Sequence, residues 1–323
     1  MIKVLVVAIA VLMFVGVFTK IRLSVMPIPQ EDMPTLSPVP NVEKKKEKEK
    51  EKERVTIVAT GDVVMGRSVN YQMVKYNNPL WPFEKVKDVL SSGDITIANI
   101  EAPFVKDCST TVEGMVFCGR EDAAKGLVAS GVDVATLANN HISDFGMAGI
   151  ENTVKVLRDN SIDITGLEGE ILYKTVKGTK VAFLAFNDIY GSIPPVLKAN
   201  AETIERLVGE ARKNADIVVV SMHWGVEYRD TPDSRQIELA HLVADAGADL
   251  IIGNHPHWIQ SDEQYKNTYI KYAHGNLVFD QMWSEETKKG VIGKYIFEDG
   301  KLIDKEFTPT YIKDYGQPQI LPN

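Results

Sequence analysis

The chain has 323 residues, of which 44% are hydrophobic and 25% are charged, so it can bury one large mixed core or two smaller ones. Its formal net charge is −8, and its one lysine-rich tract is balanced by glutamate. This composition argues against a nucleic-acid-binding protein, because no basic stripe with interleaved aromatic residues occurs. A polyanion would have to be bound locally, through metal ions or a few cationic side chains.

The first residues predict a membrane anchor or a secretory signal. Lys3 precedes an apolar run, residues 4–18, which is followed by Lys20 and Arg22. The run is at the short end for a full span, which needs about 20 apolar residues. Because no small-x-small cleavage site follows, we expect residues 1–26 to be an uncleaved single-pass anchor in the cell membrane. A cleaved peptide that releases the domain is the alternative.

Residues 27–54 predict a disordered linker. The prolines between Pro27 and Pro40 favour an extended chain, and residues 43–53 nearly alternate Lys and Glu with no apolar face. Such a segment cannot offset the conformational entropy of ordering by burying apolar surface. The folded domain is therefore expected at residues 55–323.

Within this domain, strands alternate with helices, which is typical of an α/β fold. Apolar and β-branched runs predict strands at residues 55–60, 94–98, 132–138, 162–167, 216–222, 250–252 and 267–273. Amphipathic segments predict helices at residues 80–90, 121–129, 147–158, 202–213 and 236–246. Further β structure is expected at residues 173–176, 180–186, 277–281 and 290–307.

Polar side chains follow the first strands at the points where these strands end. Asp62 comes directly after the first strand, and Asn99 and Glu101 come after the second. Because side chains alternate along a strand, Asn99 and Glu101 are expected on one side, which suits a bridge between metal ions. For Asp62 alone, capping of the next turn is an alternative role.

The third strand leads into Asn139, Asn140 and His141, and Asp144 follows. An asparagine next to a histidine can supply a neutral oxygen ligand and an acid or base side by side. Stabilising the turn is the alternative role, and it suits Asn139 better than Asn140.

Five of the six histidines come just after strand-like runs, whereas His241 lies in a helical pattern and is expected to be structural. His223 ends the strand at 216–222, and His255 and His257 follow the strand at 250–252. We expect Pro256 to hold the chain extended between the last two, so that they present imidazoles to two metal ions, or to one ion and a substrate. Two solvated loop histidines are the alternative.

Carboxylate, amide and imidazole groups therefore collect at successive strand ends, where α/β folds place their chemistry. A mixed oxygen and nitrogen set suits Mn, Fe or Zn better than a thiolate zinc site or an all-oxygen calcium site. Two such ions about 3.5–4 Å apart would bind a phosphoryl group and activate water, as in a phosphoesterase. Glycosidase chemistry through Glu101 and Glu227 is the alternative, but it gives the histidines no role.

Cys108 and Cys118 flank a polar, turn-like stretch, residues 109–114. A disulfide is expected if the domain lies outside the cytoplasm, and two buried thiols are the alternative.

The motifs occur in a particular order: Gly-Asp at 61–62, Asn-x-Glu at 99–101, Asn-Asn-His at 139–141, Met-His-Trp-Gly at 222–225, Gly-Asn-His-Pro-His at 253–257 and His-Gly-Asn at 274–276. This order resembles the CapA/PgsA capsule-synthesis family, whose domain is similar to the calcineurin-like metallophosphoesterases. The resemblance spans about residues 55–312. It implies a four-layer αββα sandwich with up to two divalent metal ions. It also implies an extracytoplasmic protein that works with capsule-synthesis membrane proteins to make or export poly-γ-glutamate or a related polymer.

The resemblance assigns His141 as the residue that protonates the leaving group. It assigns the metal ligands as Asp62, Glu101 (bridging), Asn140, His223, His255 and His257. Contacts to these ligands or to the substrate are expected from Asn99, Asn139, Asp144, Glu227, His274 and Asn276. Val64 stands where the general phosphoesterase pattern has a histidine, so one metal position is short of a ligand.

Two functions are compatible with these features. The first is a metal-dependent hydrolase that acts on an anionic polymer or a phosphoester. The alternative is a non-catalytic polymer-binding or assembly subunit that retains the fold.

Overall fold

The computed structural model describes residues 53–169 and 171–322. The predicted anchor at residues 1–26 and nearly all of the predicted linker lie outside these residues. Within the described part of the chain, no helix has both the length and the apolar character needed to cross a membrane.

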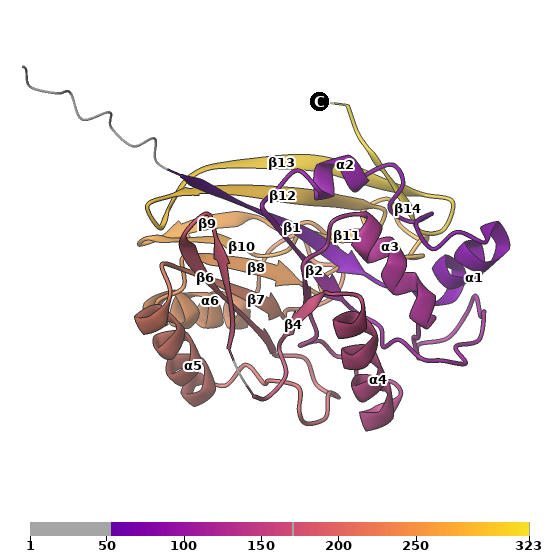
Figure 1. Cartoon of the computed structure of the whole chain (residues 1–323), viewed down its shortest axis with the longest axis horizontal. Helices are drawn as coiled ribbons and strands as arrows, with labels where there is room; N and C mark the ends of the chain where they lie inside the picture. The colour runs from indigo at the N-terminus through magenta and orange to yellow at the C-terminus, as the bar shows by residue number, and fades with distance from the viewer. Residues whose placement is uncertain (1–52, 170, 323) are drawn as a thin grey trace, which may run out of the picture. The chain divides into compact units, whose positions relative to one another are not determined.

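Two sheets form the centre of the domain (Figure 1). The first has the order β14-β13-β12-β1-β2-β3-β4, with β11 beside β1. Its strands are β1 (Arg54–Val63), β2 (Ile95–Ile100), β3 (Val134–Thr136), β4 (Asp163–Thr165), β11 (Asn276–Val278), β12 (Lys289–Glu298), β13 (Lys301–Lys313) and β14 (Gln317–Ile320). The second has the order β5-β6-β7-β8-β10-β9. Its strands are β5 (Leu172–Val176), β6 (Thr179–Asn187), β7 (Ile217–His223), β8 (Leu250–Asn254), β9 (Asp262–Tyr265) and β10 (Thr268–Lys271).

Three apolar cores show that the two sheets lie between two layers of helices. Ile57 of β1 and Phe183 of β6 belong to the core between the sheets. Val58 of β1 points the other way, because side chains alternate along a strand, and it joins the core under the helices of the first sheet. These helices are α1 (Arg67–Tyr76), α2 (Lys87–Leu90), the 3-10 helix η1 (Glu121–Ala123), α3 (Ala124–Ala129) and α4 (Gly146–Asp159). The helices α5 (Ala201–Asn214) and α6 (Ser234–Ala246) cover the second sheet. The expected αββα sandwich is confirmed.

Local sequence signals explain where α5 and α6 begin. The side chain of Asn200 accepts a hydrogen bond from the Thr203 N–H, so it caps α5. Asp233 and Gln236 form a reciprocal capping box at the start of α6. Gly247 ends α6 at φ 118°, a left-handed conformation that glycine adopts without strain.

Strand β1 changes its partner along its length, and this change positions its last residues. It pairs with β12 from Arg54 to Ala59 and with β11 at Asp62 and Val63. The register with β2 shifts between Ala59 and Asp62. Gly61 lies at this irregularity, and a Cβ atom there would be 2.1 Å from the Gly275 carbonyl oxygen. Only glycine therefore permits the close approach that places Asp62 at the centre of the sheet edge.

One predicted helix is mostly absent. The prediction for residues 80–90 is wrong up to residue 86, because only α2 at Lys87–Leu90 is helical. Pro82 has no N–H to donate, and successive turns precede α2 instead, closed by hydrogen bonds such as Phe83 N–H to Leu80 O. Helix α1 and strands β9 and β14 were not predicted.

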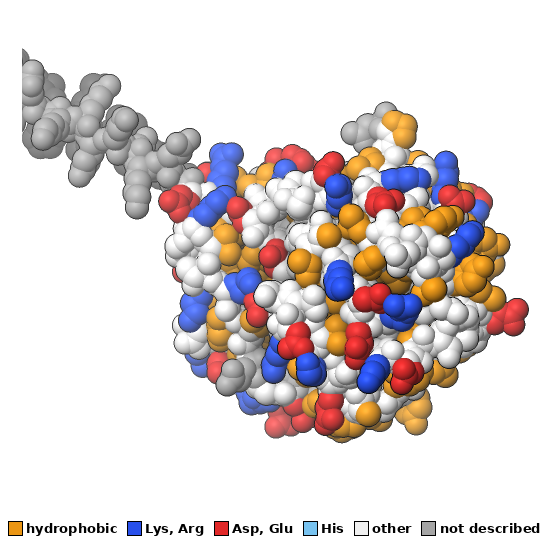
Figure 2. All heavy atoms as spheres, turned by 45° about the vertical axis from the view of Figure 1, so that its right-hand side comes forward, with side chains coloured by type: hydrophobic (Ala, Val, Ile, Leu, Met, Phe, Trp, Pro, Cys, Tyr) orange, Lys and Arg blue, Asp and Glu red, His pale blue; other side chains and the backbone are white. Residues whose placement is uncertain are grey.

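On the face that Figure 2 shows, Lys and Arg side chains are interspersed with Asp and Glu side chains. Such mixed charges largely cancel beyond the Debye length of about 8–10 Å. Any attraction of this face for a charged polymer is therefore short-ranged.

Candidate metal centre

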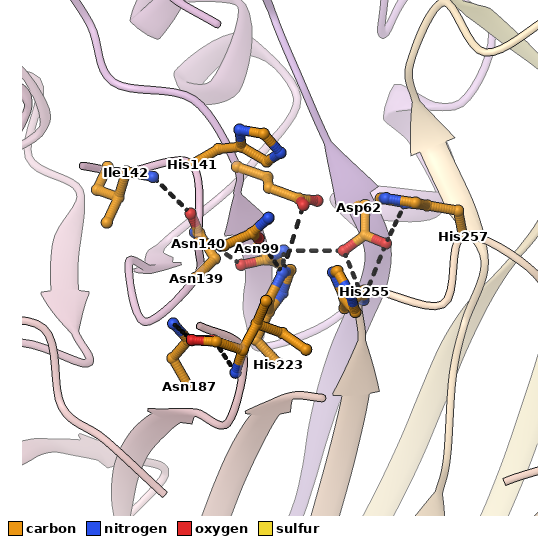
Figure 3. Close-up of polar contacts among 12 residues, drawn as sticks. Asp62, Asn99, Asn139, Asn140, His141, Ile142, Asn187, His223, His255 and His257 are labelled. Carbon is orange, nitrogen blue, oxygen red and sulfur yellow. Dashed lines mark hydrogen bonds and ion pairs between the residues drawn. The ribbon is translucent and has the colours of Figure 1, made fainter. Parts of the chain in front are cut away.

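The predicted ligands meet at one edge of the two sheets (Figure 3). Strands β1, β2 and β3 of the first sheet run parallel, as do β7 and β8 of the second, so their carboxyl ends reach this edge together. Asp62 and Glu101 come from the first sheet, and His223, His255 and His257 come from the second. All five side chains are buried.

Asp62 is the most extensively bonded member of the site. One carboxylate oxygen accepts a hydrogen bond from Asn99 Nδ2 at 2.8 Å. The other accepts from the His255 N–H at 3.2 Å and lies 3.1 Å from His257 Nδ1. Burial opposes ionisation of Asp62, but the hydrogen bond and charge of His257 outweigh it and lower the pKa of the carboxyl group. Asp62 is therefore a fixed anion.

Glu101 has the opposite environment. It is fully buried, and neither carboxylate oxygen accepts a hydrogen bond from any residue that the structure describes. Burial, followed by the charge of Asp62, raises the pKa of Glu101 well above its ordinary value. Without a cation, no hydrogen bond from a described residue compensates for the lost hydration of this carboxyl group.

His223 faces Asn140, which the family resemblance assigned as a metal ligand. Its Nε2 lies 2.8 Å from Asn140 Oδ1 and 3.3 Å from Glu101 Oε1. On the other side of the ring, Nδ1 lies 3.3 Å from Asn99 Nδ2. Burial lowers the pKa of His223 to about 3, so the ring is neutral and can bind a metal ion.

The segment that carries His255 and His257 is turned rather than extended. The φ angles are 93° at His255 and 58° at His257, so the expectation that Pro256 keeps the chain extended is wrong. Proline fixes its own φ but does not prevent left-handed conformations on both sides. Such conformations are strained in non-glycine residues and cluster at functional sites. Here they bring the two rings to a centroid distance of 5.6 Å.

The unpaired atoms of the site fit a divalent metal ion. Both Glu101 oxygens and His255 Nδ1 are buried and have no hydrogen-bond partner within residues 53–169 and 171–322. The potential ligand atoms form two sets, and within each set they lie within 4.8 Å of one another: one set comes from Glu101, His255 and His257, the other from Asp62, Glu101 and His223. Glu101 belongs to both sets, which suits the expected bridge between two ions. The mixture of carboxylate and imidazole groups suits Mn, Fe or Zn.

His141 lies beside this cluster, and its ring is oriented by two residues that are not candidate metal ligands. Its Nδ1 is 3.0 Å from Asp144 Oδ2, and its ring packs on Phe117 at a centroid distance of 4.2 Å. Asp144 Oδ2 also accepts a hydrogen bond from the Phe117 N–H at 2.7 Å. The imidazole is thus oriented by one carboxylate and one aromatic ring.

Asn99 and Asn139 brace the loop around the site. Asn139 Nδ2 donates to Ile100 O and Asn99 Oδ1, and Asn139 Oδ1 accepts from the Ile142 N–H. Asn139 therefore stabilises the turn, the role that the sequence favoured for it. Asn276 supports the ligands directly, because its Oδ1 lies 3.0 Å from His257 Nδ1.

His274 and Glu227 stand further from the ligands. The His274 ring nitrogens lie 3.3 Å from Gly253 O and 2.9 Å from the Tyr295 hydroxyl, so both are engaged away from the site. Glu227 is half-buried; burial and then the charge of Glu227 raise the pKa of the neighbouring Tyr228.

The apolar side chain of Val64 matches its surroundings in the structure. It is fully buried in an apolar cluster with Ala102, Phe117, Phe279 and Ile312. This cluster packs where the general pattern would place a histidine ligand.

Sequence reasoning missed several residues next to the site, of which Arg67, Phe117 and Asp280 matter most. Cys108 and Cys118 form a disulfide that closes the loop carrying Phe117. Phe117 and Asp280 lie in irregular segments, and Arg67 begins α1, a helix that was not predicted, so no pattern indicated these three residues.

Comparison with known proteins agrees with this geometry. Residues 56–281 match the family of bacterial capsule synthesis proteins, PGA_cap. The chain is 34% identical over 288 residues to the capsule biosynthesis protein CapA of Bacillus anthracis, covering 82% of this chain and 69% of that protein. It is 32% identical over 256 residues to the PGA biosynthesis protein CapA of Bacillus subtilis (strain 168), covering 74% of this chain and 67% of that protein.

Two solved structures share the fold. A novel phosphatase from Mycoplasma pneumoniae aligns with a TM-score of 0.56 at 12% identity, covering 82% of this chain and 95% of that one. A hypothetical protein from Thermus thermophilus aligns with a TM-score of 0.53 at 17% identity, covering 81% of this chain and all (100%) of that one. At such identities the likeness shows the fold alone.

Proposed function

Because the chain belongs to the bacterial capsule synthesis family PGA_cap, we propose that it is a metal-dependent hydrolase in the synthesis or export of a capsule polymer. The bond that it cleaves is a phosphate ester or an amide. One observation carries the proposal: the carboxyl group of Glu101 is fully buried without a hydrogen bond from any described residue, and it belongs to both groups of potential metal ligands. Burying a carboxyl group without a hydrogen bond is costly, whether the group is ionised or is forced to take up a proton, so this environment supports a cation in the working protein.

Asp62, Glu101, Asn140, His223, His255 and His257 would hold the ions. Bound metal ions would polarise the scissile group and lower the pKa of water in the site. The remaining chemistry belongs to the chain. With Nδ1 of His141 bonded to Asp144, Nε2 is the nitrogen available to transfer a proton to the leaving group. Asp144 fixes the orientation of the ring that carries this proton.

The substrate and location are part of the same proposal. Relatives bear names that refer to capsule and PGA biosynthesis, which supports an anionic polymer or a precursor of it as the substrate. Metal ions would supply the positive charge to bind it, because the chain as a whole is acidic. We propose that residues 1–26 anchor the domain to the membrane on its outer side.

The test is elemental analysis of the purified protein together with hydrolysis of chromogenic phosphate esters and γ-glutamyl amides. The variants are His255→Ala/His257→Ala and the matched control His241→Ala. His241 lies in α6, half-buried, and bonds Glu263 away from the site. The proposal expects up to two equivalents of metal, and hydrolysis of a probe, in wild type and control, with both lost in the double variant. Absence of transition metal from the wild type would overturn it.

A further inference from the structure

The disulfide loop, residues 108–118, reaches the candidate catalytic histidine through Phe117. The Phe117 N–H donates to Asp144 Oδ2 at 2.7 Å, and the same oxygen lies 3.0 Å from His141 Nδ1. The Phe117 ring also packs against the His141 ring at a centroid distance of 4.2 Å. One residue of this loop therefore contacts both members of the His141–Asp144 pair.

Arg67 links this loop to the segment that follows β11. Its side chain is 8% exposed, and its Nη1 donates to Gly114 O in the loop at 2.9 Å. Its Nε and Nη2 both donate to Asp280 Oδ1. The guanidinium carbon lies 4.6 Å from the centre of the Phe117 ring and 5.4 Å from that of Phe279. Arg67 thus joins the segment after β1, the disulfide loop and the segment after β11.

This arrangement is poorly explained by stability alone. A buried ion pair often contributes no more than the apolar side chains that could replace it. Arg67 also adopts φ 47°, a left-handed conformation that costs energy in a residue with a side chain. Its contacts give geometric precision instead, because a planar guanidinium fixes a carboxylate and a ring at once.

We propose that Phe117 is a positioning residue for His141, held in place by Arg67 and by the Cys108–Cys118 disulfide. The proposal rests on the proposed role of His141 as a proton donor. None of the candidate metal ligands lies in the disulfide loop, and Phe117 approaches His257 through the ring of Phe279, which packs on both. We therefore expect that loosening the loop disturbs the proton donor while the metal ligands stay in place. This separation distinguishes positioning from a general structural role.

The first measurement is nuclear magnetic resonance of the metal-loaded protein. It follows the hydrogen-bonded Nδ1 proton of His141 and the proximity of its ring to residue 117. The variants are Phe117→Leu, Arg67→Lys and Cys108→Ala/Cys118→Ala, with Met115→Ala as control. Met115 lies in the same loop but is 66% exposed. Metal content and thermal stability are measured for each protein.

We expect the Nδ1 proton to exchange at least tenfold faster in the three variants than in wild type and control, with metal content unchanged. Arg67→Lys and the cysteine variant keep Phe117, so they remain informative if Phe117→Leu unfolds. Unchanged exchange in folded variants, or loss of metal together with faster exchange, would overturn the proposal.

The second measurement separates this inference from the proposed function. With a hydrolysable probe, the variants should lose about tenfold in kcat with KM unchanged, and Phe117→Tyr, which keeps the ring, should restore the rate. A KM effect without a kcat effect contradicts positioning of a proton donor. If the wild type binds metal but hydrolyses no probe, the proposed function fails, and the exchange measurement still decides whether Phe117 positions His141.

Discussion

Glu101 Oε1 lies 3.3 Å from His223 Nε2, yet the geometry is not that of a hydrogen bond, and both Glu101 oxygens remain unpaired. The His223 ring is neutral, because burial lowers its pKa to about 3, so it offers no charge to Glu101. Both groups instead belong to one set of potential ligand atoms, with Asp62, that lie within 4.8 Å of one another. That arrangement is expected of ligands that share a cation.

Replacing Glu101 with Gln should therefore change stability in opposite directions with and without metal. In metal-free protein, Glu101→Gln removes a buried carboxylate whose pKa is raised by burial, so we expect a gain of about 1–3 kcal/mol in the free energy of unfolding. In metal-loaded protein the same change removes a ligand, so we expect loss of bound metal and of its stabilisation. For wild type, metal at about 100 times its Kd should stabilise by about 2.7 kcal/mol.

Thermal unfolding with and without chelator, together with elemental analysis, measures both effects. Glu263→Gln is the control, because this glutamate bonds His241 and Tyr272 at a partly exposed position outside the site. If Glu101→Gln destabilises the metal-free protein, Glu101 is satisfied without a cation and the metal site is refuted.

The free energy of unfolding of the metal-free protein should depend on pH through the protonation of His257. Burial opposes its charged form, but Glu101 and Asp62 outweigh burial and raise the pKa of His257 to about 9 from 6.5. The folded state therefore binds more protons than the unfolded state between these pH values. The stabilisation is complete below pH 6.5 and is lost as the pH rises through about 9, with a slope of at most about 1.4 kcal/mol per pH unit.

Urea unfolding of chelated protein at several pH values between 6.5 and 9.5 measures this slope. The difference between wild type and His257→Asn isolates it from other titrating groups. If the free energy of unfolding changes with pH in the same way for wild type and variant, the assignment of a charged His257 is contradicted.

The sequence predicted the ligand set because parallel strands deliver their carboxyl ends to one edge. Asp62, Glu101 and His223 could be placed there from strand periodicity, and the structure brings them together. The irregular segments were different. Residues 80–86 have a helical pattern but Pro82 interrupts it, and the left-handed φ angles at His255 and His257 follow no local rule. Tertiary contacts decide such conformations.

The contacts of His141 could also be predicted only in part from the sequence. Asp144 could be expected because it lies close in sequence, at the start of the following helix. Phe117 and Arg67 could not, since a disulfide and a buried ion pair bring them there from separate segments. The two cysteines indicated the disulfide itself but not which residue of its loop would contact His141, and no periodicity indicates an ion pair between residues 213 positions apart.

Substitution of His141 should separate an enzyme from an assembly subunit. His141→Asn should retain bound metal, because His141 belongs to neither set of potential ligands. We expect turnover of the probe to fall about 10²–10⁴-fold, the usual contribution of a general acid. Asp144→Asn should cause a smaller loss, since it weakens the orientation of the ring without removing it.

Steady-state kinetics and complementation of a capsule-deficient strain check this prediction together. Catalysis requires that His141→Asn lose capsule formation as well as turnover. Full capsule formation by His141→Asn would favour the non-catalytic assembly subunit.

The close approach of β1 and β11 should make Gly61 irreplaceable. A Cβ atom in Gly61→Ala would lie 2.1 Å from Gly275 O, a backbone atom that cannot move aside without breaking the pairing of β1 with β11. Overpacking of this kind costs about 1–3 kcal/mol. Asp62 follows directly and donates its N–H to the same Gly275 oxygen, so the displacement should also lower metal affinity.

Gly209→Ala is the matched control, because Gly209 lies within α5 with open space around its Cβ position. There alanine should stabilise the protein by about 0.5–1 kcal/mol, since it restricts the unfolded chain and favours the helix. Denaturant unfolding and metal titration of both variants test the contrast: equal stability of the two would mean that β11 yields to a methyl group, and that its approach does not fix the position of Asp62.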